Sequence, residues 1–543
     1  MRNARTLAKL MGVALAGSLL LTACGRGTPG DPTDPGESTP AGGEAASSSW
    51  SPGVYRQDEP GEPVQGGTLT FADYADGRSL DPSKHFITGF SGGTADLAIY
   101  DALVQYNADT KEFEPKLAES IEPNDDFTEW TVTLRPDTTF SDGTPLNAEA
   151  VVKSVERYIA NRGMDFAVIG PHWKGVSASD DLTVVFTLSK PWATFPAMLG
   201  LGMGMIVSPT ADQGEDFTPI GAGPFMLESY RPGEELLLKA NPNYYGGKPY
   251  LDNLRFVWLN TDQVRSEAFA EKSVDAAFLR SPRIVKELRD GGTHGYVSLQ
   301  NQGNFVQINS RAERPGSNPK VRAAVAAAIN PALVYERGQG EDTVDLAGVQ
   351  LFGPLSQWHV DVEPEPADTE RAAKLVEEAK AEGWDGKIVL THTTDRVGQD
   401  EAMTVVAQLE AAGMEVTSDG QRSPADQTKK VAVDHDFDFA KGGNSISEED
   451  PFLGLYRTMH SQSFTNALGF ADDEMDGLIE ELRAAPGDER QDVIKRIEER
   501  FQEVHPAANI GVTAPFVPWQ DNVHGIRPAN EQMMDFAKAW KSE

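Results

Sequence analysis

Alternating apolar and polar positions predict short strands in the first half of the chain. Side chains of a strand point to its two faces in turn, so a half-buried strand shows a period of two. Residues 130–134 and 181–188 follow this pattern, and residues 225–240 show it on both sides of a turn at Tyr230 to Gly233. We expect strands at residues 68–71, 130–134, 181–188, 225–240 and 254–259.

Helical spacing first appears at residues 95–106 and 148–159. Asn147 can cap the second of these helices, and the negative charge of Glu149 in its first turn interacts favourably with the positive end of the helix dipole. After about residue 300, strands alternate with helices. Strands are predicted at 305–309, 387–391 and 414–416, and helices at 319–329, 369–382 and 402–412, with Asn318 as a cap. This alternation indicates an α/β region with a largely parallel sheet.

The N-terminus has the pattern of a bacterial lipoprotein signal. Three basic residues precede an apolar run at residues 10–21, which is too short to span a bilayer. Leu21-Thr22-Ala23-Cys24 then places small residues before a cysteine. We predict a signal peptide at residues 1–23 and diacylglycerol on the Cys24 thiol. The alternative is an ordinary secretory signal with an incidental cysteine.

Cys24 is the only cysteine of the 543-residue chain, so the fold has no disulfides. Residues 24–65 are rich in Gly, Pro, Ser and acids and have almost nothing to bury, which predicts a disordered linker. The expected location is therefore the extracytoplasmic face of a cell membrane, in the periplasm or the cell-wall zone, with the lipid bilayer as a partner.

The charge and the missing motifs exclude several function classes. The formal net charge is −35, and a body this acidic should not bind nucleic acid. The nine histidines show no metal-ligand spacing, and neither a phosphate-binding loop nor a G-x-S-x-G elbow is present. We therefore expect no metal site, no cofactor and no catalytic residue.

Five segments resemble the large extracytoplasmic solute-binding proteins of ATP-driven importers, and most closely the oligopeptide/dipeptide/nickel-binding family. They follow the family's order over nearly all of residues 66–540. The segments are residues 134–151, 221–225, 241–252, 318–329 and 408–413.

The resemblance implies a two-lobed α/β fold of the periplasmic-binding-protein (Venus flytrap) type, which closes around ligand at a hinge. An extra domain would be inserted in the first lobe. The implied boundaries are 66–105, 217–300 and 516–543 for lobe I, 106–216 for the inserted domain and 301–515 for lobe II.

The resemblance also implies ligand contacts in the loop at residues 442–451. Peptide binders of the family place an aspartate there for the ligand's amino terminus, and the matching position here is Ser447, a departure from the pattern. Glu448 or Glu449 could substitute if the loop shifts. Asp450 is interpreted as a helix cap rather than a contact. The candidate contacts in this loop are Asn444, Ser445, Ser447 and Glu448.

Three further contacts are implied. Arg396 resembles an arginine that pairs with a dipeptide's carboxylate, although a solvated or internally paired arginine is the alternative. The loop Thr88, Gly89, Phe90 and Ser91 matches a loop beside the ligand, and a plain surface loop is the alternative. Trp358 could form a wall of the site, or pack in the core.

The expected function is that of a lipid-anchored, monomeric solute-binding protein, not an enzyme. It would capture peptides by hinge closure and deliver them to the permease subunits of an importer whose ATPase is a separate cytoplasmic subunit. Two alternatives stay open: the same role for a non-peptide solute (an oligosaccharide, an opine or a metal chelate), or a peptide receptor or chaperone that imports nothing.

Overall fold

The computed structural model of this chain describes residues 50–55, 61–77, 79–213 and 216–542, which belong to one compact unit. The predicted signal peptide, Cys24 and most of the 24–65 linker lie outside the described residues. No helix within the described ranges is long and apolar enough to cross a bilayer.

The first five-stranded sheet contains the earliest strand predicted from the sequence. Strand β2 lies parallel to its two neighbours, while the remaining pairs are antiparallel. In sheet order the strands are β11 (Phe225–Arg231), β12 (Glu235–Ala240), β13 (Asn253–Trp258), β2 (Thr68–Asp73) and β14 (Ala276–Ala277). The helices of this part are α1 (Gly93–Tyr100), α5 (Asp262–Ala270) and α6 (Pro282–Asp290).

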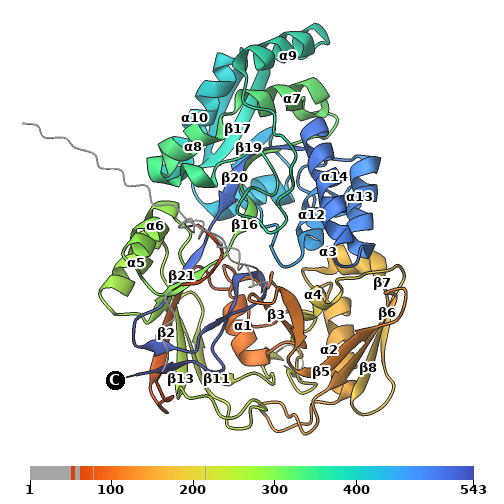
Figure 1. Cartoon of the computed structure of the whole chain (residues 1–543), viewed down its shortest axis with the longest axis vertical. Coiled ribbons are helices and arrows are strands. Elements are labelled where there is room, and N and C mark those ends of the chain that lie inside the picture. Colours follow the sequence, from red (N-terminus) through yellow and green to blue (C-terminus); the bar gives the residue numbers. More distant parts are fainter. Residues whose placement is uncertain (1–49, 56–60, 78, 214–215, 543) are drawn as a thin grey trace, which may run out of the picture. The chain divides into compact units, whose positions relative to one another are not determined.

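Residues 104–199 form a separate antiparallel sheet, a hairpin and three helices (Figure 1). The sheet order is β5 (Ala118–Pro123), β6 (Glu129–Leu134), β8 (Thr183–Leu188) and β7 (Trp173–Ala178). The hairpin pairs β3 (Val104–Asn107) with β4 (Glu112–Pro115). The helices are α2 (Ala148–Ala160), α3 (Phe166–Ile169) and α4 (Pro196–Leu199).

A second five-stranded sheet contains the strands predicted after residue 300. Its order is β18 (Glu415–Gln421), β17 (Lys387–Thr393), β19 (Phe439–Gly442), β16 (Gln300–Ile308) and β20 (Ala507–Thr513). Its helices are α7 (Pro319–Ala328), α8 (Pro331–Gly338), α9 (Thr369–Ala381), α10 (Arg396–Ala411), α11 (Pro424–Thr428), α12 (Pro451–Met459), α13 (Asp473–Ala484) and α14 (Glu489–Val504).

Two neighbouring stretches of chain connect the sheets. β15 (Gly295–Val297) leads into β16, and β20 leads into β21 (Phe516–Pro518), which pairs with β15. β1 (Gly53–Tyr55) pairs with the other edge of β15. The remaining short pairs are β9 (Asp212–Gln213) with β10 (Asp216–Phe217), β22 (Val523–His524) with β25 (Trp540–Lys541), and β23 (Arg527–Pro528) with β24 (Met534–Asp535).

The C-terminal segment returns to the first sheet. Phe536, just after β24, packs edge-on against Phe71 of β2 with ring centroids 5.7 Å apart. The two lobes and the inserted domain thus have counterparts in separate sheets, although their residue boundaries stay a prediction. We use lobe I for the first sheet with the C-terminal segment, inserted segment for residues 104–199, and lobe II for the second sheet with α7–α14.

Local capping signals are confirmed. Asn147 Oδ1 accepts a hydrogen bond from Ala150 N at 3.0 Å, and Asn318 Oδ1 accepts one from Lys320 N at 2.8 Å. The expectation of a largely parallel second sheet is wrong, because β16 is antiparallel to both β19 and β20.

The expected single helix at residues 95–106 is also wrong. The helix ends at Tyr100, because Asp101 takes a positive φ of 56°. The Asp101 carboxylate is buried beside Lys116 at 3.1 Å and accepts a hydrogen bond from Ala102 N. These contacts turn the chain into strand β3.

The glycine-rich turn at 221–225 has a packing reason. A Cβ on Gly221 would lie 2.4 Å from the carbonyl oxygen of Ile99, and one on Gly223 would lie 2.5 Å from that of Ala98. Only glycine allows this approach to helix α1.

Candidate ligand-binding site

A cavity of about 230 Å³ is bounded by segments of both lobes and of the inserted segment. We call it the main cavity because the predicted loop at 442–451 borders it, although two other spaces, of about 610 Å³ and about 590 Å³, are larger. Its walls carry two tyrosines, one lysine and two glutamates. The lining residues are Pro52, Gly53, Tyr106, Ala108, Lys111, Tyr296, Ser298, Leu299, Leu355, Ser356, Gln357, Glu448, Glu449 and Gln532.

The loop at 442–451 is attached to the start of strand β16. Asn444 N donates to the carbonyl oxygen of Gln302 at 3.0 Å, and Ile446 N donates to that of Asn301 at 3.1 Å. The Asn444 side chain also donates to Gln302 Oε1 at 3.2 Å. Ser445 Oγ is buried with no hydrogen-bond partner among the described residues. Backbone pairing with β16 therefore holds the loop in place.

Ser447 is buried, and its hydroxyl accepts a weak hydrogen bond from Asp450 N at 3.4 Å. Asp450 precedes α12, where a cap was expected, but its side chain makes no capping hydrogen bond. Asp450 is nevertheless the N-cap residue of α12, with Pro451 at the first helical position, as expected. Its carboxylate also pairs with Arg490 and accepts a hydrogen bond from Thr194 Oγ1 at 3.0 Å. Burial raises the pKa of Asp450, while Arg490 opposes this shift.

Glu448 organises the loop that contains Trp358. Its Oε1 accepts hydrogen bonds from Ser356 Oγ at 2.6 Å and Asn301 Nδ2 at 2.5 Å, and its Oε2 accepts one from Gln357 N at 2.8 Å. The half-buried Trp358 donates its indole N–H to the Glu448 carbonyl oxygen at 2.8 Å, and the Arg490 guanidinium lies 4.7 Å above its ring. Glu448 therefore acts here as a positioning residue.

Glu449 was named from the sequence only as a possible substitute for the aspartate, and in the structure the Ser447 hydroxyl donates a hydrogen bond to its carboxylate. It lines the main cavity and also a second space of about 10 Å³, which we call the small cavity. Glu531 lines the small cavity from the C-terminal segment, and its side chain is only 4% exposed. Burial raises the pKa of both carboxyl groups. The Glu531 carboxylate adds to the rise at Glu449, whereas Asp165 and Asp450 add to the rise at Glu531.

Sequence reasoning missed Glu531 altogether. The residue lies in a turn where it and Gln532 both take positive φ values, 49° and 66°. No motif marks this turn. An acidic residue placed where non-glycine backbone is strained becomes recognisable only in three dimensions.

The predicted loop at 88–91 supports that turn. Gly89 N donates to the Glu531 carbonyl oxygen at 2.8 Å, and a Cβ on Gly89 would lie 2.1 Å from the Gln532 carbonyl oxygen. Within the loop, the hydroxyls of Thr88 and Ser91 lie 2.7 Å apart. The structure therefore brings this loop next to the site rather than leaving it at an unrelated surface.

Arg280 lies beside Phe90 and adds a positive charge to this region. The Arg280 guanidinium lies 5.3 Å from the Phe90 ring and donates to Gln300 Oε1 at 3.2 Å. Gln300 Nε2 donates in turn to Gln532 Oε1 at 2.9 Å, at the wall of the main cavity. The position of Arg280 just after β14 is its only sequence signal, since ligands gather at the carboxyl ends of strands in α/β folds.

Arg396 is not brought together with these residues. It begins helix α10, its side chain is 92% exposed, and its ion pair is with Asp400 at 3.8 Å.

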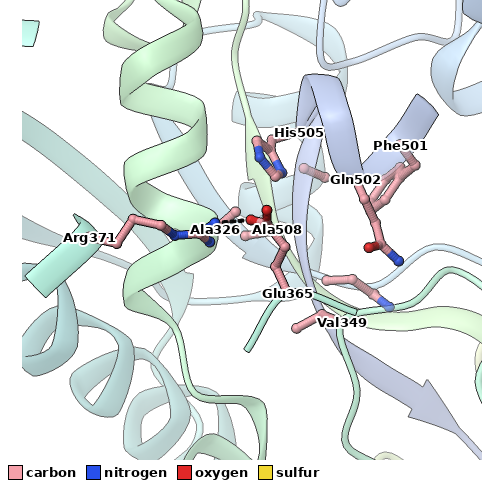
Figure 2. Close-up of a pocket in the computed structure, with 10 residues that line it drawn as sticks. Ala326, Val349, Glu365, Arg371, Phe501, Gln502, His505 and Ala508 are labelled. Atoms are coloured by element: carbon pink, nitrogen blue, oxygen red, sulfur yellow. Dashed lines mark hydrogen bonds and ion pairs between the residues drawn. The ribbon is translucent and has the colours of Figure 1, made fainter. Parts of the chain in front are cut away.

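Another cavity, of about 30 Å³, lies inside lobe II, beside α14 and β20 (Figure 2). Arg371 and Glu365 form an ion pair at its edge. Burial and the nearby Arg371 and Arg322 lower the pKa of His505 to about 4, so this imidazole is neutral. None of the predicted contacts lines this space. Across the described ranges, no group of three or more His, Cys, Asp or Glu is arranged to hold a metal ion.

Comparison with known proteins identifies the family. The model of the bacterial extracellular solute-binding proteins, family 5, matches residues 112–466. The chain belongs to this family. Its members are binding proteins and not enzymes, so the expectation that the chain is not an enzyme is confirmed.

Relatives with known names support the same conclusion. The chain is 37% identical over 311 residues to the probable D,D-dipeptide-binding periplasmic protein DdpA of Escherichia coli, a match over 54% of this chain and 58% of DdpA. It is 28% identical over 418 residues to Protein XP55 of Streptomyces lividans, over 70% and 72% of the two chains.

Two solved structures of the family show the same fold. The periplasmic binding protein DppA of Helicobacter pylori, in complex with the peptide STSA, has a TM-score of 0.74 at 24% identity, over 88% of this chain and 99% of that one. AgaA of A. tumefaciens R10, in complex with agropinic acid, has a TM-score of 0.71 at 26% identity, over 84% and 94%. The predicted two-lobed α/β fold is thereby confirmed.

Proposed function

We propose that this protein is the lipid-anchored solute-binding component of an ATP-driven importer, and that it captures peptides and delivers them to permease subunits. The observation that carries the proposal is the main cavity, to which both lobes contribute lining residues. A ligand held there contacts Gln532 of lobe I and Glu449 of lobe II at once, so binding favours the closed arrangement.

The chemistry of the lining suits a short peptide. Tyr106 and Tyr296 offer aromatic surface to side chains, while Ser298, Gln357 and Gln532 offer hydrogen bonds to a peptide backbone. Glu449 offers negative charge to an amino terminus, and Lys111 offers positive charge to a carboxylate. The relatives named for dipeptides support this choice.

An opine is the second candidate, since AgaA was solved with agropinic acid. The membrane anchor rests on the Cys24 pattern alone. In this proposal the acyl chains hold the protein at the extracytoplasmic face of the membrane, and the ATPase is supplied by the importer.

The test is a thermal-shift screen of the full chain in mild detergent, followed by intrinsic tryptophan fluorescence. Pools of di- to hexapeptides, sugars, opines and metal chelates are compared. A ligand at 100 times its dissociation constant should add about 2.7 kcal/mol to the free energy of unfolding. A thermal shift with peptides alone supports the proposal, whereas a shift with opines alone shows that the solute is an opine and not a peptide.

A further inference from the structure

Residues 50–55 add a strand to the two stretches of chain that join the lobes. β15 runs into β16 of lobe II, and β21 returns from lobe II to lobe I. β1 pairs antiparallel with the other edge of β15, from Gly53 opposite Val297 to Tyr55 opposite Gly295. Any hinge motion between the lobes has to pass through these two stretches. We call residues 50–55 the N-terminal strap.

Two aromatic side chains fix the N-terminal strap at its ends. Trp50 is 1% exposed and belongs to the buried apolar cluster that also contains Leu279 of lobe I and Val306 of lobe II. The Arg289 guanidinium, near the end of α6, lies 3.2 Å from the centroid of the Tyr55 ring, which is a cation–π contact. Side-chain contacts therefore hold the strap in addition to the backbone pairing.

The middle of the N-terminal strap forms one wall of the main cavity. Pro52 and Gly53 line this cavity, as does Tyr296 of the neighbouring strand β15. Gly53 takes a φ of 143°, and no protein atom lies within 4 Å of the position that a Cβ would occupy. The Gly53 backbone therefore faces open space at the cavity wall.

The N-terminal strap is an addition to the fold rather than a part of either large sheet. β1 pairs with neither five-stranded sheet, so its release breaks no strand pairing inside them. A three-residue strand at a sheet edge also opens at a lower free energy than a central strand. In the sequence, Trp50 follows Cys24 by 26 residues, and β2 begins 13 residues after Tyr55. The strap thus lies between the predicted lipid anchor and lobe I.

We propose that the N-terminal strap is part of the solute-binding site, and that docking of the strap on β15 and binding of the solute strengthen each other. A solute in the main cavity contacts Pro52 and Gly53 only while the strap is docked, so it binds the docked state more tightly. By linkage, a bound solute must favour the docked strap by the same factor. The strap then connects the membrane-anchored end of the chain to the occupied site.

The main cavity as the solute site rests on the proposed function, whereas the docked strap does not. A strap that only braced the fold would behave differently. Its loss would destabilise the body of the protein, but a bound solute would leave the exchange of its amide hydrogens unchanged. Amide exchange within residues 50–55 therefore separates the two roles.

The experiment measures deuterium uptake and solute affinity of the full chain in mild detergent. Pools of di- to hexapeptides, sugars, opines and metal chelates are added in turn, and calorimetry gives the affinity for each pool. Trp50→Ala and Tyr55→Ala release the strap. Val64→Ala is the matched control, since this apolar side chain is 45% exposed and lies outside the strap, nine residues after Tyr55. If Trp50→Ala does not fold, Tyr55→Ala, whose ring is only half-buried, tests the same point.

We expect the peptide pool to slow deuterium uptake at residues 50–55 in the unaltered chain and in Val64→Ala. Both strap variants should take up deuterium rapidly at residues 50–55 and bind the peptide pool at least tenfold more weakly. Uptake in α7 and α9 of lobe II should stay as in the unaltered chain, which shows that the body remains folded.

Rapid uptake at residues 50–55 with unchanged affinity would remove the strap from the site and leave peptide capture standing. A loss of affinity together with faster uptake in α7 and α9 would show that the strap only braces the fold. If another pool slows uptake at residues 50–55 and peptides do not, the strap stands and peptide capture falls. If no pool slows that uptake, the strap proposal is overturned.

Discussion

Phe452 of helix α12 packs edge-on against Trp192 of the inserted segment, with ring centroids 5.1 Å apart. Figure 1 shows helices α12–α14 beside this segment. Arg457, one and a half turns further along α12, forms its ion pair with Asp165 of the same segment. An apolar and a charged contact therefore hold lobe II against the inserted segment, through the helix that follows the loop containing Glu449.

Truncating this aromatic contact should destabilise the whole unit. Phe452 is fully buried, so Phe452→Ala leaves a cavity and should lower the free energy of unfolding by about 3–5 kcal/mol. Urea unfolding measures the loss, and Phe464→Ala is the control because that side chain is 61% exposed. Equal effects of the two substitutions would show that the aromatic contact carries no special stability.

Glu448→Ala should act through the loop at 355–358. The change leaves Ser356 Oγ, Asn301 Nδ2 and Gln357 N without their acceptor, which should cost about 1–3 kcal/mol of stability. Glu448→Gln keeps one acceptor oxygen and should recover part of that loss. Urea unfolding of both variants checks this, and an unchanged stability of Glu448→Ala would contradict the positioning role.

The Glu498 contribution to the stability of the folded chain should fall as the pH rises from about 4.5 to about 7. Burial raises the pKa of Glu498 from its usual 4.5 to about 7, although Leu351 N and Phe352 N donate to it. In this window the carboxyl of the unfolded chain ionises while that of the folded chain keeps its proton. The unfolded state is thereby stabilised relative to the folded state, and the free energy of unfolding falls. Asp73, whose pKa burial raises to about 7, acts in the same direction.

Glu498→Gln removes the contribution of Glu498 to this dependence of stability on pH. Its free energy of unfolding should fall less steeply than that of the unaltered chain between pH 5 and pH 7, and the two slopes should agree above pH 8. Urea unfolding at each pH provides the comparison. Parallel slopes throughout the window would refute the raised pKa of Glu498.

Arg396→Ala should leave ligand affinity within about twofold, because its exposed side chain does not line the main cavity. Calorimetry with the ligand found in the screen measures this. Arg280→Ala is the companion variant, since Arg280 is linked to the cavity wall through Gln300. A large loss with Arg396→Ala would restore the role that the resemblance implied.

Cys24→Ser should release the protein from the membrane fraction, since acyl chains provide the anchor in this account. Cell fractionation and labelling with a radioactive fatty acid report the change. A variant that stays membrane-bound would rule out the lipoprotein signal.

Local sequence signals predicted much of the fold but little of the site. Asn147 and Asn318 cap helices as expected, because a cap involves residues only two or three positions apart. Asp450 has the same local signal, yet Arg490, forty residues later, takes its carboxylate. Glu531 lies 82 residues after Glu449, and no local pattern links them. Contacts between distant segments decide the site, and a single sequence does not reveal them.

The most direct measurement is the identity of the molecule that the protein retains. The full chain is purified without refolding and denatured, and the released small molecules are analysed by mass spectrometry. The account predicts peptides of two to about six residues with free amino termini, in a ratio near one per chain. Release of an opine, a sugar or a metal chelate in that ratio, without peptides, would contradict it.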